Sequence, residues 1–423
     1  MRTCFLLGGA FGLLTACNPA PKPDTASTST GPATTFGPAT TYAVDYWPRA
    51  LAVADLNADG RPDLVTVNDG KSRGDDGGRS AISIEALSQG LGRLFGVKEV
   101  GSATVWLGQG EGRFAARCDY PLGRFPEGLA LADFAGDCRP DLLTLSTDLD
   151  REKHMYLLPG RGAAGGFGPA ALSPFEGILD DPGNLAVADL NADGRPDLVL
   201  AASIGNGGVE VRLTQAGGGF GPAVSYPTGP RYSPRSVALA DVDGDGHTDA
   251  IVTNGEGFRL DSTTVLLPGQ GGGTFGPPRA YLSVWGPTAL TDLNDDGRPD
   301  LLTVSARALT VRSGGKAGFG PATALPGLGL EPNSLAVADV NGDGRPDLVT
   351  THDRARDADP GQAWAALRLG LPGGGWGPPT DYPIGPFYAA QMRLTDVNAD
   401  GRPDLITMNH NTNSIQVRLN QGR

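Results

Sequence analysis

The stretch Asp55–Asp63 reads Asp-Leu-Asn-Ala-Asp-Gly-Arg-Pro-Asp, and it is one of seven copies of the same nonapeptide. The other copies are Asp133–Asp141, Asp189–Asp197, Asp241–Asp249, Asp292–Asp300, Asp339–Asp347 and Asp396–Asp404. Their first residues are separated by 78, 56, 52, 51, 47 and 57 residues. A motif repeated at such a period indicates a fold built from repeated supersecondary units.

Short apolar alternations flank the copies. Leu51–Ala54 precedes the first copy and Leu64–Val67 follows it, and period-two runs on both sides of a turn indicate two antiparallel strands. A third strand such as Val265–Pro268 comes next, then a Gly-rich turn that closes in Phe-Gly-Pro. A fourth strand often ends near Tyr-Pro, as at Tyr226-Pro227. Four short strands in ~50 residues is the spacing of a propeller blade.

The composition supports this reading. The 423 residues include 64 Gly and 35 Pro, and no stretch without either is longer than 18 residues, which excludes long helical bundles and polytopic membrane folds. The formal net charge of −13 argues against nucleic-acid binding. Positions 1, 3, 5 and 9 of the seven copies hold 22 Asp, nearly half of the 47 acids, so the acidity reflects the nonapeptides and does not indicate a cationic partner.

The two ends of the chain supply complementary pieces of one blade. The last copy is followed by a third strand, Ile415–Asn420, whereas Phe36–Tyr42 holds the missing Phe-Gly-Pro turn and fourth strand. We therefore predict an all-β fold for residues 36–423, a seven-bladed β-propeller of four-stranded antiparallel blades whose ring is closed by the N-terminal strand. Residues 69–101 contain no copy of the motif and are predicted to be an insertion in the first blade.

The amino terminus reads as a targeting segment. Arg2 precedes the apolar run Phe5–Ala16, which is too short to span a bilayer, and the run ends Leu-Thr-Ala before Cys17. This ending resembles the lipobox of bacterial lipoproteins, and it implies a signal peptide at 1–16, acylation of Cys17 and a lipid anchor as the membrane attachment. Residues 17–35 are rich in Pro, Thr and Ser and are predicted to be a solvated tether. Asn18 favours an outer-membrane destination by the same resemblance; an ordinary signal peptide is the alternative.

The nonapeptide has the residue types of a cation site. Asp at positions 1 and 5 and Asp or Asn at position 3 supply oxygen ligands, and Gly at position 6 allows a positive φ. Pro at position 8 restricts residue 7 and directs its backbone carbonyl, and Asp at position 9 completes the shell. Hard oxygen ligands without His or Cys favour calcium over magnesium. Position 12 is never acidic, which excludes an EF-hand; simple turn formation is the alternative.

The repeat resembles the FG-GAP or VCBS repeat family, found in integrin α-chain propellers and many bacterial surface proteins. The resemblance covers residues 36–423 and implies calcium, mainly structural, in the hairpin between the first two strands of a blade, at about six sites. The implied ligands, with position 7 acting through its carbonyl, are Asp55, Asn57, Asp59, Arg61 and Asp63; Asp189, Asn191, Asp193, Arg195 and Asp197; Asp241, Asp243, Asp245, His247 and Asp249; Asp292, Asn294, Asp296, Arg298 and Asp300; Asp339, Asn341, Asp343, Arg345 and Asp347; and Asp396, Asn398, Asp400, Arg402 and Asp404.

The copy at Asp133 departs from the pattern. Ala135 replaces the ligand at position 3 and Cys138 replaces the Gly at position 6, so metal binding is left open in this loop. Cys118 and Cys138 remain once the signal peptide and acylation account for the other two cysteines. We predict a disulfide between them that replaces the lost ion; two unpaired thiols are the alternative.

Aromatic and Arg residues precede the first strand of several blades. They are Tyr46, Trp47, Arg49, Arg124, Phe125, Arg231, Tyr232, Arg235, Trp285, Phe387 and Tyr388. The repeat register places them on one rim of the ring, opposite the calcium hairpins, where they suit a glycan or protein ligand. Packing between blades or in the central channel is the alternative. The four His, at 154, 247, 352 and 410, share no repeat position, and we expect them on the solvated surface.

The sequence therefore predicts a calcium-binding lipoprotein of the cell envelope that acts as a monomeric binding or adhesion module and is not an enzyme. A propeller enzyme acting on polysaccharide, a lyase or a hydrolase, is the alternative, and Tyr46, Arg124, Arg231 and Tyr232 are the residues that it would use. The fold does not decide between these two functions.

Overall fold

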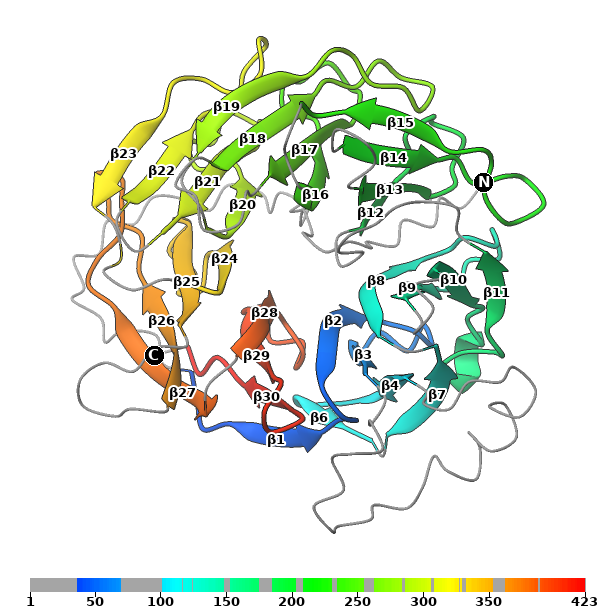
Figure 1. Cartoon of the computed structure of the whole chain (residues 1–423). Helices are drawn as coiled ribbons and strands as arrows, with labels where there is room; N and C mark the ends of the chain where they lie inside the picture. Colours follow the sequence, from blue (N-terminus) through cyan, green and yellow to red (C-terminus); the bar gives the residue numbers. More distant parts are fainter. Residues whose placement is uncertain are drawn as a thin grey trace.

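The computed structural model describes residues 36–69, 101–115, 117–123, 125–147, 153–174, 185–202, 208–229, 234–254, 262–283, 286–305, 308–326, 328, 332–352, 362–386 and 389–422. These residues form seven four-stranded antiparallel sheets arranged as a ring (Figure 1), together with one 3₁₀ turn, η1 (Gly162–Ala164). The prediction of an all-β, seven-bladed propeller is confirmed. No helix in the described ranges is long or apolar enough to cross a membrane. The predicted signal peptide, Cys17, the tether and residues 70–100 of the insertion lie outside the described residues.

Blades one to six each use four strands in chain order, from the centre of the ring outward, whereas the outermost strand of blade seven is β1 (Figure 1). The first three blades are β2 (Pro48–Ala54), β3 (Asp63–Asn68), β4 (Gly101–Trp106) and β7 (Cys118–Leu122); β8 (Pro126–Ala132), β9 (Asp141–Thr147), β10 (Lys153–Leu158) and β11 (Ala171–Pro174); and β12 (Leu185–Ala188), β13 (Asp197–Ala202), β14 (Gly208–Arg212) and β15 (Val224–Pro227). A small hairpin of β5 (Gly108–Gly110) and β6 (Arg113–Phe114) lies in the third turn of blade one.

Blades four to seven follow the same plan. They are β16 (Pro234–Ala240), β17 (Asp249–Asn254), β18 (Ser262–Leu267) and β19 (Arg279–Ser283); β20 (Thr288–Thr291), β21 (Asp300–Val304), β22 (Ala308–Arg312) and β23 (Thr323–Pro326); β24 (Ser334–Ala338), β25 (Asp347–His352), β26 (Gln362–Arg368) and β27 (Thr380–Pro386); and β28 (Ala389–Thr395), β29 (Asp404–Asn409), β30 (Ser414–Arg418) and β1 (Thr40–Ala43).

The ring is closed by the N-terminal strand, as predicted. In blade seven β1 pairs antiparallel with β30, with Tyr42 opposite Ile415. Phe36 extends the pairing through a bridge to Asn420, and the Gly37 N–H donates to the Leu419 carbonyl at 2.8 Å. The closure leaves no unpaired edge on β30, which would otherwise template aggregation.

Every nonapeptide is the hairpin between the first and second strands of a blade, because its ninth residue begins the second strand, as Asp63 begins β3. Since neighbouring strands are antiparallel, these hairpins and the turns between third and fourth strands lie at one face of the ring, called here the hairpin face. The segments that lead into the first strands lie at the opposite face, called here the rim face. The predicted division of the ring into two faces therefore follows from the observed register.

The core lies between the blades. Val65 and Val105 of blade one pack in one buried cluster with Leu142 and Phe167 of blade two, and similar clusters follow around the ring. Aromatic pairs mark these seams: Tyr120 of β7 meets Phe167 of blade two edge-on with ring centroids 5.6 Å apart. The Tyr-Pro and Phe-Gly-Pro signals of the sequence are thus the two halves of a contact between neighbouring blades.

Two expectations are wrong. Cys118 begins β7, the outermost strand of blade one, whereas Cys138 lies in the inner hairpin of blade two, and no disulfide joins these two exposed residues of the described chain. Strands spaced ~4.8 Å apart put the edge of one blade and the inner hairpin of the next beyond the ~7 Å Cα separation that a disulfide spans. His352 is 3% exposed, not solvated, because it ends β25 opposite Trp364 and its Nε2 lies 2.8 Å from Thr350 Oγ1.

Candidate functional site

The backbone of the seven hairpins has two left-handed residues each. At position 6, φ is 82° for Gly60 and 63° for Cys138, as the sequence argument required. At position 4, φ is also positive in every hairpin, although this residue is Ala58, Ala192 or Ala399 in three of them. A Cβ at Gly60 would meet no atom within 4 Å, so the backbone angle alone favours glycine there.

The acid at position 1 organises the hairpin. Asp55 Oδ1 accepts the Asp59 N–H at 3.1 Å and its Oδ2 accepts the Gly60 N–H at 2.8 Å. Asn57 Oδ1 also accepts the Asp59 N–H at 3.0 Å, and Asp59 Oδ1 accepts the Arg61 N–H at 2.8 Å. The same acceptor role of position 1 recurs in the other six hairpins. These bonds gather the side-chain oxygens of positions 1, 3 and 5 on one short turn.

The acid at position 9 has a second role that the sequence argument missed. Asp63 is fully buried; its Oδ2 accepts the Leu56 N–H at 2.8 Å and its Oδ1 accepts the Gly108 N–H at 2.6 Å. Leu56 belongs to the hairpin and Gly108 to the turn between the third and fourth strands, so one carboxylate joins the two turns of the blade. All seven blades repeat this bridge, at 2.6 to 3.0 Å. The sequence feature that indicates this second role is the Asp at position 9, which is present even in the degraded copy.

Burial makes this arrangement electrostatically costly without a cation. Desolvation raises the pKa of Asp63, Asp249 and Asp404 to about 6, although their N–H donors act in the opposite direction and the acids at positions 1, 3 or 5 add to the increase. The pKa values of Asp141, Asp197, Asp300 and Asp347 are raised for the same reasons. A bound cation would relieve both the burial and the repulsion.

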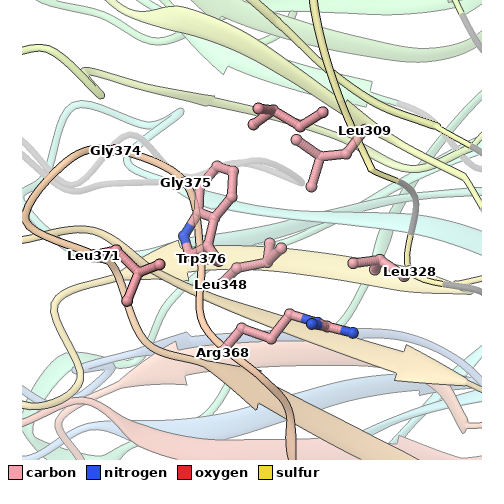
Figure 2. A pocket seen from close by; sticks show the side chains of 9 residues that line it. Leu309, Leu328, Leu348, Arg368, Leu371, Gly374, Gly375 and Trp376 are labelled. Atoms are coloured by element: carbon pink, nitrogen blue, oxygen red, sulfur yellow. The ribbon is translucent and has the colours of Figure 1, made fainter.

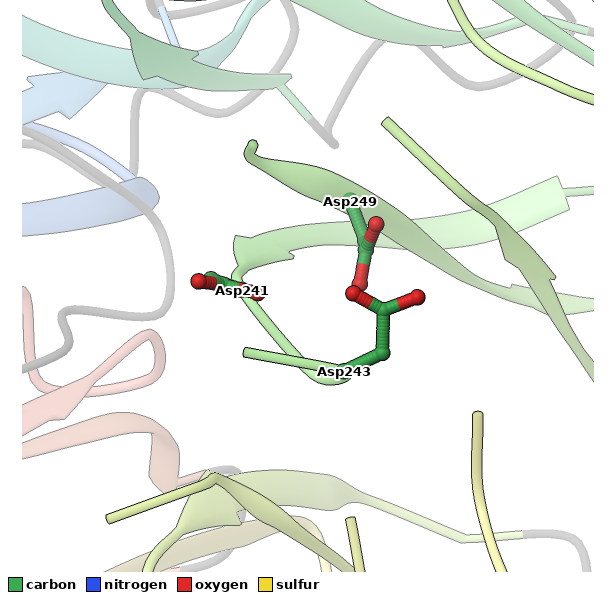
Figure 3. A group of neighbouring side chains, drawn as sticks. All are labelled: Asp241, Asp243 and Asp249. Carbon is green, nitrogen blue, oxygen red and sulfur yellow. The ribbon is translucent and has the colours of Figure 1, made fainter. Parts of the chain in front are cut away.

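The hairpin of blade four has the most complete acidic cluster. One carboxylate oxygen each from Asp241, Asp243 and Asp249 lies within 4.8 Å of the others, and the carboxylates of Asp243 and Asp249 face each other (Figure 3). Asp243 Oδ1 is buried and has no hydrogen-bond partner in the described part of the chain. Burial, followed by Asp245 and Asp241, raises the Asp243 pKa. An unpaired buried oxygen beside two further carboxylates fits a hard divalent cation, which Asp241, Asp243, Asp245, Asp249 and the His247 carbonyl would hold.

The Arg side chains at position 7 also contribute to the hairpin. Arg345 Nε donates to the Gly370 carbonyl at 3.1 Å, and Arg402 Nε and Nη2 donate to the Asn420 carbonyl at 3.4 Å and to Asp400 Oδ2 at 2.7 Å. The guanidinium therefore ties the hairpin to the adjacent turn and neutralises part of the charge at position 5. The nonapeptide pattern predicts a role for the carbonyl of this residue only, and the contacts of the guanidinium are seen in the structure.

The degraded hairpin keeps its shape without the full ligand set. Asp133 Oδ1 and Oδ2 accept the N–H groups of Asp137 and Cys138 at 2.9 and 2.7 Å. Asp141 keeps the bridge to the next turn through Ala135 and Gly160. The carboxylates of Asp133 and Asp141 thus hold the backbone of this hairpin, without a disulfide and without a side-chain ligand at position 3.

On the rim face, the structure describes Tyr46, Trp47, Arg49 and Phe125. Trp47 has a φ of 52°, its N–H donates to Asn413 Oδ1 at 2.8 Å, and its half-buried ring meets the His410 ring edge-on at 5.6 Å. Burial and then Arg49 lower the His410 pKa to about 4, and Arg49 pairs with Asp69 at 2.8 Å. Trp47 thus spans the seam between blades seven and one.

The remaining rim predictions stay predictions. Arg124, Arg231, Tyr232, Trp285, Phe387 and Tyr388 lie outside the described residues, as does the side chain of Arg235.

Comparison with known proteins identifies the repeat. FG-GAP-like repeats match residues 133–200, 189–252 and 292–350, and FG-GAP repeats match residues 47–84 and 233–273. The chain is an FG-GAP repeat β-propeller. These matches include six of the seven nonapeptide hairpins and belong to the family that the hairpins and Phe-Gly-Pro turns indicated.

Solved structures of low sequence identity are similar to this chain. The Dos1 propeller is similar with a TM-score of 0.51 and 8% identity, over 90% of this chain and 95% of that chain, which shows the fold alone. A protein from Lactobacillus plantarum has a TM-score of 0.46 and 14% identity over 80% and 86% of the two chains. The V. cholerae biofilm matrix protein Bap1 has a TM-score of 0.40 and 11% identity over 92% and 91%. No curated protein matches the chain.

Proposed function

We propose that this FG-GAP propeller is a calcium-stabilised, monomeric binding module of the bacterial cell envelope, attached through a lipid on Cys17, with its ligand on the rim face. The ligand class that we propose is a glycan, and the outer membrane is the proposed location. The module is proposed to bind without chemical turnover.

The single observation that carries the binding role is the strained aromatic rim. Trp47 and Phe125 occupy equivalent places before Pro48 and Pro126, which begin the first strands of neighbouring blades, and their φ angles are 52° and 44°. Left-handed backbone costs an ordinary L-residue ~1–2 kcal/mol, and such strain is concentrated at ligand sites where the surroundings enforce it. Two neighbouring blades therefore each place an aromatic residue with a left-handed backbone at the same face, and such an arrangement suits stacking against sugar rings.

The proposed calcium has a structural role in this account. The carboxylates that would hold it include the position-9 acid, and that acid joins the hairpin to the next turn in every blade. Ion binding would offset the repulsion within each hairpin and fix the two turns of the hairpin face relative to each other. The rim face would then be supported by blades of fixed geometry.

A glycan array tests the proposal with the mature chain from residue 18 onward, with calcium and with chelator. We expect calcium-dependent binding that Trp47→Ala weakens at least tenfold, while Leu371→Ala, a change of an exposed side chain on the hairpin face, leaves it unchanged. Binding to a protein but to no glycan would contradict the glycan ligand and indicate a protein ligand instead. Release of shortened saccharides would contradict the proposal and support the polysaccharide enzyme.

A further inference from the structure

Five of the seven seams between blades contain the same aromatic pair. A Tyr of the fourth strand lies six residues after an aromatic residue in the preceding turn of its own blade, a Phe in four blades and Trp376 in the fifth, and it packs edge-on against the Phe of the next blade. The pairs are Tyr42–Phe114, Tyr120–Phe167, Tyr226–Phe275, Tyr281–Phe319 and Tyr382–Phe36, with ring centroids 5.2 to 5.6 Å apart. The place that receives the Tyr ring is called here the tyrosine seat.

The best-described seat lies between blades four and five. The Tyr281 hydroxyl accepts the Phe319 N–H at 3.1 Å, and the Arg312 guanidinium lies over the ring, 5.5 Å from its centroid. Tyr382 accepts the Phe36 N–H in the same way at 3.4 Å. A tyrosine seat thus offers a ring edge, a backbone donor for the hydroxyl and, in this seam, a cation above the ring.

The seam between blades five and six has no such pair. Leu325 stands at the Tyr position, since it is paired with Leu309 as Tyr226 is with Val209. Trp376 stands at the Phe position, and its indole N–H donates to the Pro346 carbonyl at 3.0 Å, which holds the ring toward its own blade. The ring that fills the other five seats is missing here.

A pocket of about 240 Å³ lies in this seam (Figure 2). Its lining includes Leu309, Leu325, Leu348, Arg368, Leu371 and Trp376. Arg368 pairs with Leu348 at the register where Arg312 pairs with Leu301, so it takes the place of the cation that covers Tyr281. Leu371 is 46% exposed, and the pocket is therefore open to solvent beside an apolar side chain.

We propose that this pocket is an open tyrosine seat that binds the side chain of a tyrosine presented by a partner polypeptide. The pocket has an aromatic neighbour, Trp376, at the Phe position and an arginine at the register where the Tyr281 seat has one, and the Tyr ring is missing from it. In the five filled seams the ring arrives from a polypeptide strand beside the next blade, whereas here a tyrosine of a partner polypeptide would enter the pocket from the solvent beside Leu371. The seat lies between blades five and six, whereas Trp47 and Phe125 precede blades one and two, so this proposal does not rest on the proposed rim site.

The experiment follows the Trp376 indole N–H resonance of the ¹⁵N-labelled mature chain, assigned with Trp376→Phe, during titration with N-acetyl-tyrosinamide. We expect a saturable shift, and an at least fivefold weaker response to N-acetyl-leucinamide, because a leucine side chain offers no ring to Arg368 or Trp376. Leu325→Tyr places the missing ring in the seat and should abolish the response while raising the melting temperature, which shows that the variant folds.

Val224→Tyr is the matched control, because Val224 lies in a fourth strand and is 50% exposed; this variant should bind like the wild type. The proposal is overturned by the absence of a saturable shift, by equal binding of the leucine analogue, or by unchanged binding in Leu325→Tyr. Binding of p-cresol without binding of N-acetyl-tyrosinamide would contradict the proposal that the partner is a polypeptide, because the seat would then accept only a free phenol.

Discussion

Calcium-free protein is expected to gain stability when the pH falls from 7 to 5. The cause is the position-9 acids, since burial raises the pKa of Asp63, Asp249 and Asp404 from 3.8 to about 6. A carboxyl group with a raised pKa in the folded state binds its proton more tightly there than in the unfolded chain. Its stabilising effect is therefore fully present below pH 3.8 and is lost as the pH rises through 6.

The size of the effect follows from proton linkage. With a pKa of 6 in the folded state and 3.8 in the unfolded chain, each acid raises the free energy of unfolding by ~1.3 kcal/mol from pH 7 to pH 5. Three such acids in separate blades raise it by ~4 kcal/mol. His410 acts in the opposite direction, because its lowered pKa of about 4 means that only the unfolded chain takes up a proton in this interval. That opposing contribution is ~1.8 kcal/mol, which leaves a net gain of ~2 kcal/mol.

Chemical denaturation at pH 7 and pH 5, after calcium has been removed on a chelating resin, measures this gain. Asp63→Asn removes one titrating group and should reduce the gain by ~1.3 kcal/mol, whereas His410→Gln should increase it to ~4 kcal/mol. In excess calcium the dependence should reverse, because protons then compete with the ion. A calcium-free protein whose stability stays constant or falls from pH 7 to pH 5, in the His410→Gln background as well, would refute the reasoning.

Three further predictions address the hairpins and the closure. Cys138→Gly should raise the free energy of unfolding by ~1 kcal/mol, because it relieves a φ of 63°, and Gly60→Ala should lower it by a similar amount. Urea denaturation measures both changes, and a Gly60→Ala variant as stable as the wild type would contradict the role of the left-handed backbone. Asp243→Asn should weaken calcium binding in blade four at least tenfold by calorimetry, and an unchanged affinity would remove Asp243 from the ligand set. Phe36→Ala should cost ~3–5 kcal/mol of stability, because Phe36 is 6% exposed and seats the closing strand; a loss below 1 kcal/mol in thermal or urea unfolding would show that the closure does not depend on this ring.

Much of the architecture could be predicted because it is local. The alternation around Asp55–Asp63 sets two strands and their turn, and its seven copies set the number of blades. The closure was also predictable, since Phe36–Tyr42 is the fragment that the last copy lacks. The pairing of Cys118 with Cys138 and the exposure of His352 were wrong, because both depend on how far apart neighbouring blades hold these residues.

The sequence by itself determined the blade count, the closing strand and the place of every acidic hairpin, since each follows from a pattern within ~50 residues. Only the tertiary structure decided that the position-9 acid spans two turns, that Trp47 packs across the closing seam, and that Leu325 and Trp376 leave a tyrosine seat open. These contacts join segments that lie far apart in the chain or in different blades. Their geometry is set by strand register and by the packing of one sheet against the next, which no local pattern specifies.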